Sequence, residues 1–283
     1  MTVRLSAGSD SAQVDPSAGG RLASLVAGGR ERLVDRPQPG ATLPAISWGS
    51  FLMAPWVGRI AEGRVAWRGC AAQLPCNDGR HALHGALLDV PWQVERRDDT
   101  SIELSCQISS ERWPFGGRAW QRLTLGPGSL RCEATLTAGQ PTPAALGWHP
   151  WFRRGPDEDL QVTVHADRRL ELDAEMIPSG VSLPVTGIYD LRAGPVLGLR
   201  RLDDVYVDAG GPATVRWPDL ELQIDFEAPL SSVVVFSPPG SVCVEPATAW
   251  PDALRLSAAG VPGTGQVVLE SGETLAATMT WRW

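Results

Sequence analysis

The stretch Leu220-Glu221-Leu222-Gln223-Ile224-Asp225-Phe226 alternates apolar and polar side chains at every position. This period of two is typical of a β-strand that buries one face and exposes the other. The same alternation recurs in five other segments: Ile102–Ile108, Trp120–Leu125, Leu130–Leu136, Leu160–His165 and Thr274–Trp281. We therefore predict that all of these segments are β-strands.

Helical patterns are almost absent from the chain. No stretch of about twelve residues or more repeats its apolar side chains with the period of a helix, and only Asp252–Ala259 could form a helical turn or two. The 30 glycines and 24 prolines are scattered among the strand segments, where they mark turns. Strands at intervals of about ten residues, separated by turns, predict an all-β fold, specifically a large antiparallel β-sandwich.

The domain organisation follows from length and composition. A chain of 283 residues can bury about three-quarters of its unfolded surface. No low-complexity segment or long linker divides it, so we predict a single domain over residues 1–283. The segment Asp35–Pro44, rich in proline and glycine, is predicted to be a surface loop.

Charge and hydropathy exclude several classes of partner. The net charge is −7, and no basic tail or stripe could follow a phosphate backbone, so we expect no nucleic-acid partner. No apolar run is long enough for a membrane helix, so we expect no membrane partner. The first residues lack the pattern of an export signal, and we therefore expect a cytoplasmic location.

Two residue types limit the chemistry. The five cysteines contain no C-x-x-C pair, which favours buried thiols over a disulfide framework or a zinc site. Lysine is missing, so all 25 basic residues are arginine. The protein therefore cannot form a lysine Schiff base or supply the lysine of a phosphate-binding loop.

Four histidines are candidates for a functional site. His165 occupies a polar position of a predicted strand, which favours a surface role. His81 and His84 lie close together, but no third ligand at a recognised spacing accompanies them, so we predict no metal site. His149 lies among aromatic residues in Gly147–Phe152 and should be partly desolvated. Its sequence context alone leaves open whether it is functional or a structural core histidine.

Glu245 is the main carboxylate candidate. It follows the apolar run Val242–Val244 and precedes Pro246, so we predict that it lies at the end of a buried strand, at a rim where pockets form. Desolvation there would make Glu245 a stronger base. A structural role, in which its carboxylate accepts hydrogen bonds from the following turn, is an equally good interpretation.

Tryptophan is unusually frequent, with 12 residues against two tyrosines. Flat rings can lie against the apolar face of a sugar, but they also fill sandwich cores. Five tryptophans lie beside the polar candidates and therefore merit attention as binding residues: Trp56, Trp92, Trp148, Trp151 and Trp250.

Five short segments follow one another along most of the chain: Pro55–Ile60 with Gly63, Leu83–Gly85 before Pro91 and Trp92, Gly147–Phe152, Leu202–Tyr206, and Val244–Thr248 continuing to Ala253. Together they resemble the aldose 1-epimerase (galactose mutarotase) family, whose corresponding motifs are Asn-Arg-Ile-x-x-Gly, His-Gly, His-Pro-Tyr/Trp-Phe, Asp-x-x-Phe and Glu-Pro-x-Thr. The resemblance implies the large antiparallel β-sandwich of that family, the galactose mutarotase-like supersandwich.

The resemblance also implies a reaction, the interconversion of the α and β anomers of a free sugar by ring opening and reclosure. Glu245 would be the general base and His149 the general acid. Three further residues would bind or orient the hydroxyls of the small-molecule substrate: Arg59, His84 and Asp203. Trp151 is expected to contact the sugar ring. No metal or cofactor is implied, because a carboxylate and an imidazolium can carry out both proton transfers.

Two departures from the motifs bear on sugar preference. Gly58 stands where the family has asparagine, and the residues after Gly85 lack an arginine often found there. The choice of Asp203 over Asp204 rests on a short match. A hexose 6-phosphate mutarotase is one alternative, since Arg59, Arg64, Arg80 and Arg153 could bind a phosphate. A non-catalytic carbohydrate-binding protein of the same fold is another.

Overall fold

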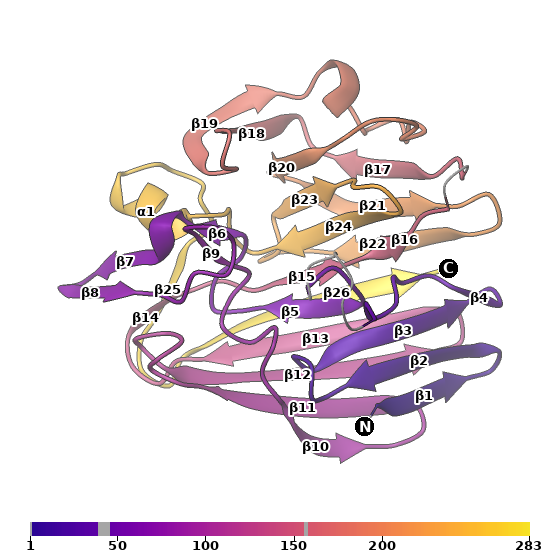
Figure 1. Ribbon diagram of the computed structural model, residues 1–283, viewed down its shortest axis with the longest axis horizontal. Helices are drawn as coiled ribbons and strands as arrows, with labels where there is room; N and C mark the ends of the chain where they lie inside the picture. Colours follow the sequence, from indigo (N-terminus) through magenta and orange to yellow (C-terminus); the bar gives the residue numbers. More distant parts are fainter. Residues whose placement is uncertain (1, 39–45, 156–157) are drawn as a thin grey trace.

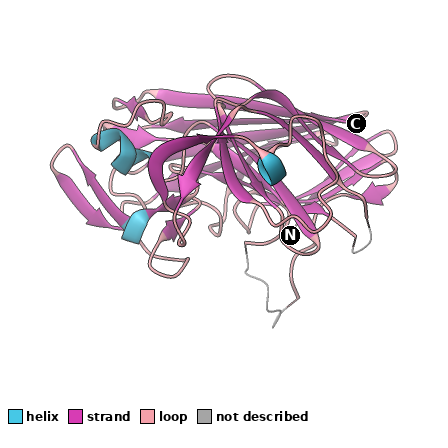
Figure 2. Cartoon of the chain, turned by 90° about the horizontal axis from the view of Figure 1, so that it is seen from above, coloured by secondary structure: helices cyan, strands magenta, loops and turns pink. Residues whose placement is uncertain are grey.

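The computed structural model describes residues 2–38, 46–155 and 158–283. Most of these residues form β-strands, and the helical segments between them are short (Figures 1 and 2). Residues 39–44 of the loop predicted at Asp35–Pro44 lie outside the described residues. No helix in the described ranges is long and apolar enough to cross a membrane.

The larger sheet has twelve strands. Its main path, which runs from the lower to the upper edge of Figure 1, is β1 (Val3–Ala7), β2 (Asp10–Asp15), β3 (Arg21–Ala27), β5 (Ser50–Met53), β15 (Gly147–Pro150), β24 (Ser241–Ala247), β23 (Ser232–Phe236), β20 (Asp203–Val207), β18 (Arg168–Leu172) and β19 (Pro178–Pro184). Two short strands attach to this path, β4 (Arg30–Glu31) on β3 and β16 (Phe152–Arg153) on β24.

The second sheet has eight strands. Their order is β10 (Gln93–Arg97), β11 (Ser101–Ile108), β12 (Gly117–Gly126), β13 (Ser129–Thr137), β26 (Thr274–Arg282), β22 (Glu221–Phe226), β21 (Gly210–Arg216) and β17 (Gln161–His165). All six segments predicted from alternation lie on strands of this sheet, which confirms those predictions. Along β22 buried residues alternate with exposed or half-buried ones, as expected for a strand with one face in the core.

The remaining elements are short. Three two-stranded ribbons are β6 (Arg59–Ile60) with β9 (Ala82–Leu83), β7 (Arg64–Trp67) with β8 (Cys70–Gln73), and β14 (Thr142–Ala144) with β25 (Val267–Leu269). The helical segments are η1 (Ala61–Gly63), η2 (Gly187–Tyr189) and α1 (Ala253–Ala258). The last of these confirms the helical turn predicted within Asp252–Ala259.

The two large sheets pack face to face over one hydrophobic core. A single cluster of buried side chains takes members from both sheets, and Phe152 of the larger sheet contacts Trp281 of the smaller one with ring centroids 5.1 Å apart. The pairings within both sheets are antiparallel. The predicted antiparallel sandwich is therefore confirmed. Because the core cluster extends from Leu5 to Trp281, we propose that the chain folds as one domain.

Candidate active site

Strand alternation places three of the candidate residues, His149, Asp203 and Glu245, on the face of the larger sheet that points away from the smaller sheet. Along β24, Val242 and Val244 belong to the shared core, whereas Cys243 belongs to a separate cluster and Glu245 lines a cavity. Successive side chains of a strand point to opposite faces, so Glu245 shares the outward face with Cys243. On β15, Trp148 likewise enters the core and His149 lines the cavity.

Strand register brings His149 and Glu245 together. Gly147 of β15 pairs with Ala247 of β24, and Phe152 of β16 pairs with Val242 in the same register. This register sets His149 opposite Glu245. On the other side of β15, His149 pairs directly with Phe51 of β5. Three residues far apart in the sequence therefore form one row across neighbouring strands.

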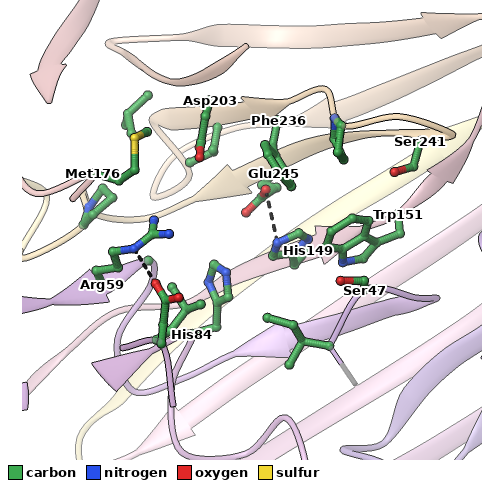
Figure 3. Close-up of a pocket in the computed structure, with 18 of the residues that line it drawn as sticks. Ser47, Arg59, His84, His149, Trp151, Met176, Asp203, Phe236, Ser241 and Glu245 are labelled. Atoms are coloured by element: carbon green, nitrogen blue, oxygen red, sulfur yellow. Dashed lines mark hydrogen bonds and ion pairs between the residues drawn. The ribbon is translucent and has the colours of Figure 1, made fainter. Parts of the chain in front are cut away.

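The cavity over this row has a volume of about 540 Å³, within the range of small-molecule sites. Strands of the larger sheet form its floor, and loops cover its sides (Figure 3). Its polar side chains are Ser47, Arg59, Asp78, His84, His149, Asp203, Ser241 and Glu245. Its larger apolar side chains are Val34, Ile46, Leu83, Trp151, Leu172, Met176, Val205, Val234, Phe236, Pro238, Pro239 and Pro251.

His149 and Glu245 form a buried pair. Nε2 of His149 lies 3.4 Å from Oε1 of Glu245, and the side chains are 4% and 2% exposed. The His149 ring stacks with two aromatic rings, Phe51 at 4.9 Å and Trp151 at 5.2 Å between centroids. Figure 3 shows Trp151 and His84 on opposite sides of His149. This packing fixes the imidazole plane, so its nitrogen stays directed at the carboxyl group.

Burial sets the protonation of this pair. It raises the pKa of Glu245 well above its ordinary value, and the charge of Asp203 raises that pKa further, while Arg59 lowers it. Burial lowers the pKa of His149 well below its ordinary value, with smaller contributions from His84 and Arg21. Both shifts therefore favour the uncharged forms of the two groups, a neutral imidazole and a protonated carboxyl group.

His84 completes the centre of the site. It follows β9, and its backbone N–H donates to the carbonyl of Gly58 at 2.9 Å. Its φ of 61° is left-handed, and a Cβ on the next residue, Gly85, would lie 2.3 Å from the carbonyl oxygen of Ala54. Such a backbone requires glycine after the histidine. Burial, followed by the charge of Arg59, lowers the pKa of His84 to about 3, so the ring is neutral.

The same three residues have the chemistry of a cation site. His84, His149 and Glu245 are all buried, and each offers a ligand atom within 4.8 Å of the others. Two neutral imidazoles and a carboxylate are a donor set that zinc accepts.

Arg59 and Asp203 form the charged side of the cavity. Nε of Arg59 donates to Oδ2 of Asp78 at 2.7 Å, which fixes the guanidinium at the cavity wall. Asp203 lines the cavity, and burial, opposed by Arg59 and helped by Asp204 and Asp78, raises its pKa to about 6. Its carboxyl group is therefore largely ionised at neutral pH and able to accept hydrogen bonds.

Strand alternation also distinguishes the two adjacent aspartates of β20. Asp203 shares its face with Val205, which lines the cavity too, whereas Asp204 points to the opposite face. Nη1 of Arg169 donates to Oδ1 of Asp204 at 3.0 Å. The choice of Asp203 as the cavity residue therefore agrees with the geometry.

The structure brings together all six residues selected from the sequence: Arg59, His84, His149, Trp151, Asp203 and Glu245. Glu245 was placed incorrectly in one respect, because β24 continues to Ala247 and Glu245 lies within the strand. Its side chain reaches the cavity through the face of the sheet rather than at a rim.

The other histidines lie outside the cavity. His165 is exposed on β17, as predicted. His81 is buried, and its Nδ1 accepts a hydrogen bond from the backbone N–H of Glu62 at 3.0 Å. Neither of these two is among the described residues that line the cavity.

Two sequence interpretations were only partly right. Of the five tryptophans singled out, Trp151 lines the cavity, while the other four are buried elsewhere: Trp56, Trp92, Trp148 and Trp250. All five cysteines are unpaired, but only three are buried, because Cys76 is exposed and Cys70 is half-buried. Both lie on or beside the small β7–β8 ribbon, which has little core of its own.

Several cavity residues were not found from the sequence. Asp78 carries a weak signal, since Asp78-Gly79 is a turn dipeptide shortly before β9. Phe236 ends a run of valines on β23 and pairs with Asp203, a contact that depends on strand register. Met176, Ser47 and Ser241 show no distinguishing pattern.

The backbone conformation and the surroundings of Gly58 explain why this position carries glycine rather than asparagine. Its φ is 59°, and a Cβ there would lie 2.6 Å from Cγ of Pro251. The ring of Pro251 thus occupies the space where a side chain at position 58 would begin, and this part of the cavity wall is apolar.

Known proteins resemble this chain in sequence. Residues 1–282 match the sequence model of the family described as Aldose 1-epimerase. Galactose mutarotase of Rattus norvegicus is 33% identical over 150 residues, which cover 50% of this chain and 44% of the relative. Galactose mutarotase of Sus scrofa is 32% identical over 161 residues, covering 53% and 46%. These matches therefore span less than half the length of either relative.

Solved structures share the fold along the whole chain. A galactose mutarotase-like protein from Clostridium acetobutylicum has a TM-score of 0.84 at 16% identity, covering 99% of this chain and 94% of that one. An aldose epimerase homologue from C. elegans has a TM-score of 0.84 at 18% identity, covering 100% and 98%. With the match of the family model to residues 1–282, it follows that this chain belongs to the aldose 1-epimerase family.

Proposed function

We propose that the protein is an aldose 1-epimerase, an isomerase of carbohydrate metabolism that interconverts the α and β anomers of a free aldose. One observation carries the proposal. His149 and Glu245 form a buried pair, 3.4 Å apart, on the floor of a cavity of about 540 Å³. Such a pair can accept a proton from one atom of a ligand and return a proton to a neighbouring atom.

The reaction requires this proximity. Ring opening removes the proton of the anomeric hydroxyl and protonates the ring oxygen, and both oxygens are bonded to the same carbon, C1. Glu245 accepts the first proton and His149 donates the second. The bond between C1 and the ring oxygen then breaks, C1–C2 rotates, and the ring closes on the other face of the carbonyl. For closure the two residues exchange roles.

The directions of the two pKa shifts fit this cycle. Burial favours the uncharged forms of both groups, so the proton that His149 donates would come from Glu245 before ring opening. The transfer leaves the net charge of the pair unchanged, and the nearby positive charge of Arg59 favours the carboxylate form of Glu245. Because burial makes His149 a weak base, a proton placed on it is readily given to the ring oxygen.

The other cavity residues would hold the sugar. Arg59 keeps donors for sugar oxygens beyond the Nε used by Asp78, and Asp203 accepts hydrogen bonds from hydroxyls. His84 is neutral and can accept or donate. Trp151 stacks one face on His149, so a sugar would contact its edge or its other face.

The alternative substrate, a hexose 6-phosphate, has weaker support. Of the four arginines considered, only Arg59 lines the cavity within the described part of the chain. The other three form ion pairs outside it: Arg64 with Glu62, Arg80 with Glu62 and Glu175, and Arg153 with Asp35. We therefore favour an unphosphorylated aldose.

We also propose a cytoplasmic location. The five cysteines are all unpaired, which fits a reducing compartment.

Polarimetry of freshly dissolved α-glucose and α-galactose tests the proposed function. We expect the wild type to accelerate the approach to anomeric equilibrium and His149→Asn to lose most of that acceleration. A folded wild type that binds aldoses but does not hasten equilibration of any of them would instead be a carbohydrate-binding protein.

A further inference from the structure

The cavity extends well beyond the His149–Glu245 pair. Ser241 begins β24 and, like Glu245, lines the cavity. The two positions are four residues apart, so their α-carbons are separated by about 13 Å at the usual rise of a strand. Figure 3 shows Ser241 and Trp151 on one side of the pair and Arg59 on the other. A single sugar ring placed at the pair is too short to fill both sides.

The side of the cavity that Ser241 lines is uncharged. We call it the serine end and define it by three lining residues, Ser47, Trp151 and Ser241. The charged side chains among the described lining residues lie at the pair or on the side of Arg59, and they are Arg59, Asp78, Asp203 and Glu245. The ring of Phe236 meets that of Trp151 edge-on, with centroids 5.8 Å apart. The two ends of the cavity therefore suit different parts of a ligand.

Polar groups at the serine end lack partners within the protein. Ser47 and Ser241 are 5% and 4% exposed, and neither hydroxyl forms a hydrogen bond with another described residue. The indole N–H of Trp151, a residue that is 6% exposed, also has no partner in the described ranges. Buried polar groups of native proteins are nearly always hydrogen-bonded. Three unpaired groups in one part of a cavity therefore indicate that a bound molecule supplies the missing bonds.

The chemistry of these groups indicates the class of ligand. Neutral hydroxyl and N–H groups suit the hydroxyls of a sugar, and an aromatic ring suits the apolar face of a sugar ring. A phosphate would need a cation at this end, and a purely apolar group would leave both serine hydroxyls unsatisfied. A sugar residue is therefore the occupant that matches the aromatic ring and the polar groups together.

The reaction restricts how this second sugar residue is attached. The anomeric hydroxyl of the reacting residue must stay free, so the second residue is linked through another of its oxygens. In the proposed cycle His149 protonates the ring oxygen, and the ring of Trp151 stacks on that imidazole at 5.2 Å between centroids. The ring oxygen is bonded to C1 and C5, and C5 carries C6. The 6-hydroxyl would therefore point toward the serine end, while C2, C3 and C4 would face the side of Arg59.

We propose that the serine end is a second sugar subsite, and that the preferred substrate is a reducing disaccharide whose second residue is linked to the 6-hydroxyl of the reacting one. The inference rests on the proposed function and deepens it, since the reacting residue lies at the His149–Glu245 pair and undergoes the same ring opening. Binding of the second residue adds free energy at a distance from the reacting bond, and such binding energy raises kcat/KM.

Three sugars with the same reacting residue test the subsite: glucose, maltose, which carries a second glucose on the 4-hydroxyl, and isomaltose, which carries it on the 6-hydroxyl. Exchange NMR of the anomeric protons at equilibrium gives the rate for each sugar without a pure anomer. We expect kcat/KM for isomaltose to exceed the values for glucose and maltose by about tenfold, the effect of one or two hydrogen bonds. Equal values for isomaltose and glucose would overturn the subsite and leave the epimerase function standing. A preference for maltose over isomaltose would overturn the linkage.

Calorimetry distinguishes a failure of the subsite from a failure of the proposed function. If the wild type exchanges the anomers of none of the three sugars, the proposed function fails, and equilibrium binding decides about the subsite. Isomaltose that binds about tenfold more tightly than glucose supports the subsite. Equal affinities for the two sugars exclude it.

Variants at the serine end locate the second sugar residue. The double variant Ser47→Ala/Ser241→Ala removes both hydroxyls without adding volume, and Ser241→Leu fills the space. Ser50→Ala is the matched control, because Ser50 is a buried serine of the same sheet, 6% exposed, that is not among the described residues lining the cavity.

The readout is the ratio of kcat/KM for isomaltose to that for glucose, measured within each variant, so that a loss of folded protein cancels. This ratio should fall toward one in the double variant and in Ser241→Leu, and it should keep its wild-type value in Ser50→Ala. A wild-type ratio in the folded double variant would overturn the assignment of the serine end. Should Ser241→Leu not fold, the double variant decides alone.

Discussion

The substitution Glu245→Gln tests the proposed base most directly. Glutamine has nearly the same shape as glutamate, and Glu245 is 2% exposed, so the exchange preserves packing while removing the titratable group. General acid–base catalysis contributes about 10²–10⁴-fold, which corresponds to about 3–5 kcal/mol of transition-state stabilisation. We expect the catalysed rate of anomer exchange to fall by about that factor.

Whereas the catalysed rate should fall in Glu245→Gln, the stability of the folded protein should stay the same or rise. Because the folded protein raises the pKa of Glu245, it binds a proton that the unfolded chain has already lost once the pH exceeds the ordinary glutamate value. The wild type therefore loses stability as the pH rises through this range, and Glu245→Gln does not. We expect the variant to unfold at the same temperature as the wild type or higher at pH 8, with a smaller difference at pH 5.

Polarimetry and thermal unfolding, measured on the same preparations, provide the assay. Asp204→Asn is the control, since Asp204 is also a buried carboxyl group, 6% exposed, but faces away from the cavity. It should keep the wild-type rate, because its side chain does not line the cavity. Full activity in a folded Glu245→Gln protein would refute the assignment of the base.

Three further predictions follow from the cavity. Asp203→Asn should raise KM for the sugar by about tenfold through the loss of a charged acceptor, and an unchanged KM would exclude Asp203 from sugar binding. Because burial raises the pKa of Asp203 to about 6, the substitution should also raise the unfolding temperature more at pH 8 than at pH 4. Zn²⁺ should inhibit anomer exchange by binding His84, His149 and Glu245, and EDTA should restore the rate. Calorimetry should show weaker zinc binding in His84→Asn. Activity that is unaffected by excess Zn²⁺ would contradict the cation site. The value of kcat/KM for glucose 6-phosphate should be lower than that for glucose, because Arg59 alone among the four candidate arginines lines the cavity and is already paired with Asp78; a preference for the phosphorylated sugar would reverse the substrate assignment.

The sequence was most informative where one face of a strand is buried. Strands such as β12, β13 and β22 alternate because their two faces meet different environments, and alternation located them. All seven residues of β24 are buried, so its sequence carries no alternation from which the direction of Glu245 could be read. Its pattern indicates only a buried strand, and the position of Glu245 within that strand was predicted incorrectly.

The composition of the site was predictable through short motifs, but its geometry was not. His149 and Glu245 meet because β15 and β24 pair in one particular register, and no local pattern encodes a pairing between segments so far apart in the chain. Asp78 was missed for the same reason. It acts through a partner distant in sequence, Arg59.

The cross-strand row has a consequence for how this protein can change over time. A one-residue insertion or deletion within β24 would turn Glu245 into the core and present Val244 or Pro246 to the cavity, since neighbouring strand residues point to opposite faces. The same holds for His149 on β15. Loops around the cavity can vary in length and so alter which sugar is accepted. The central strands must keep their number of residues if His149 and Glu245 are to face the cavity. Substitution, rather than insertion or deletion, is therefore the route by which these strands can diversify without losing the proton-transfer pair.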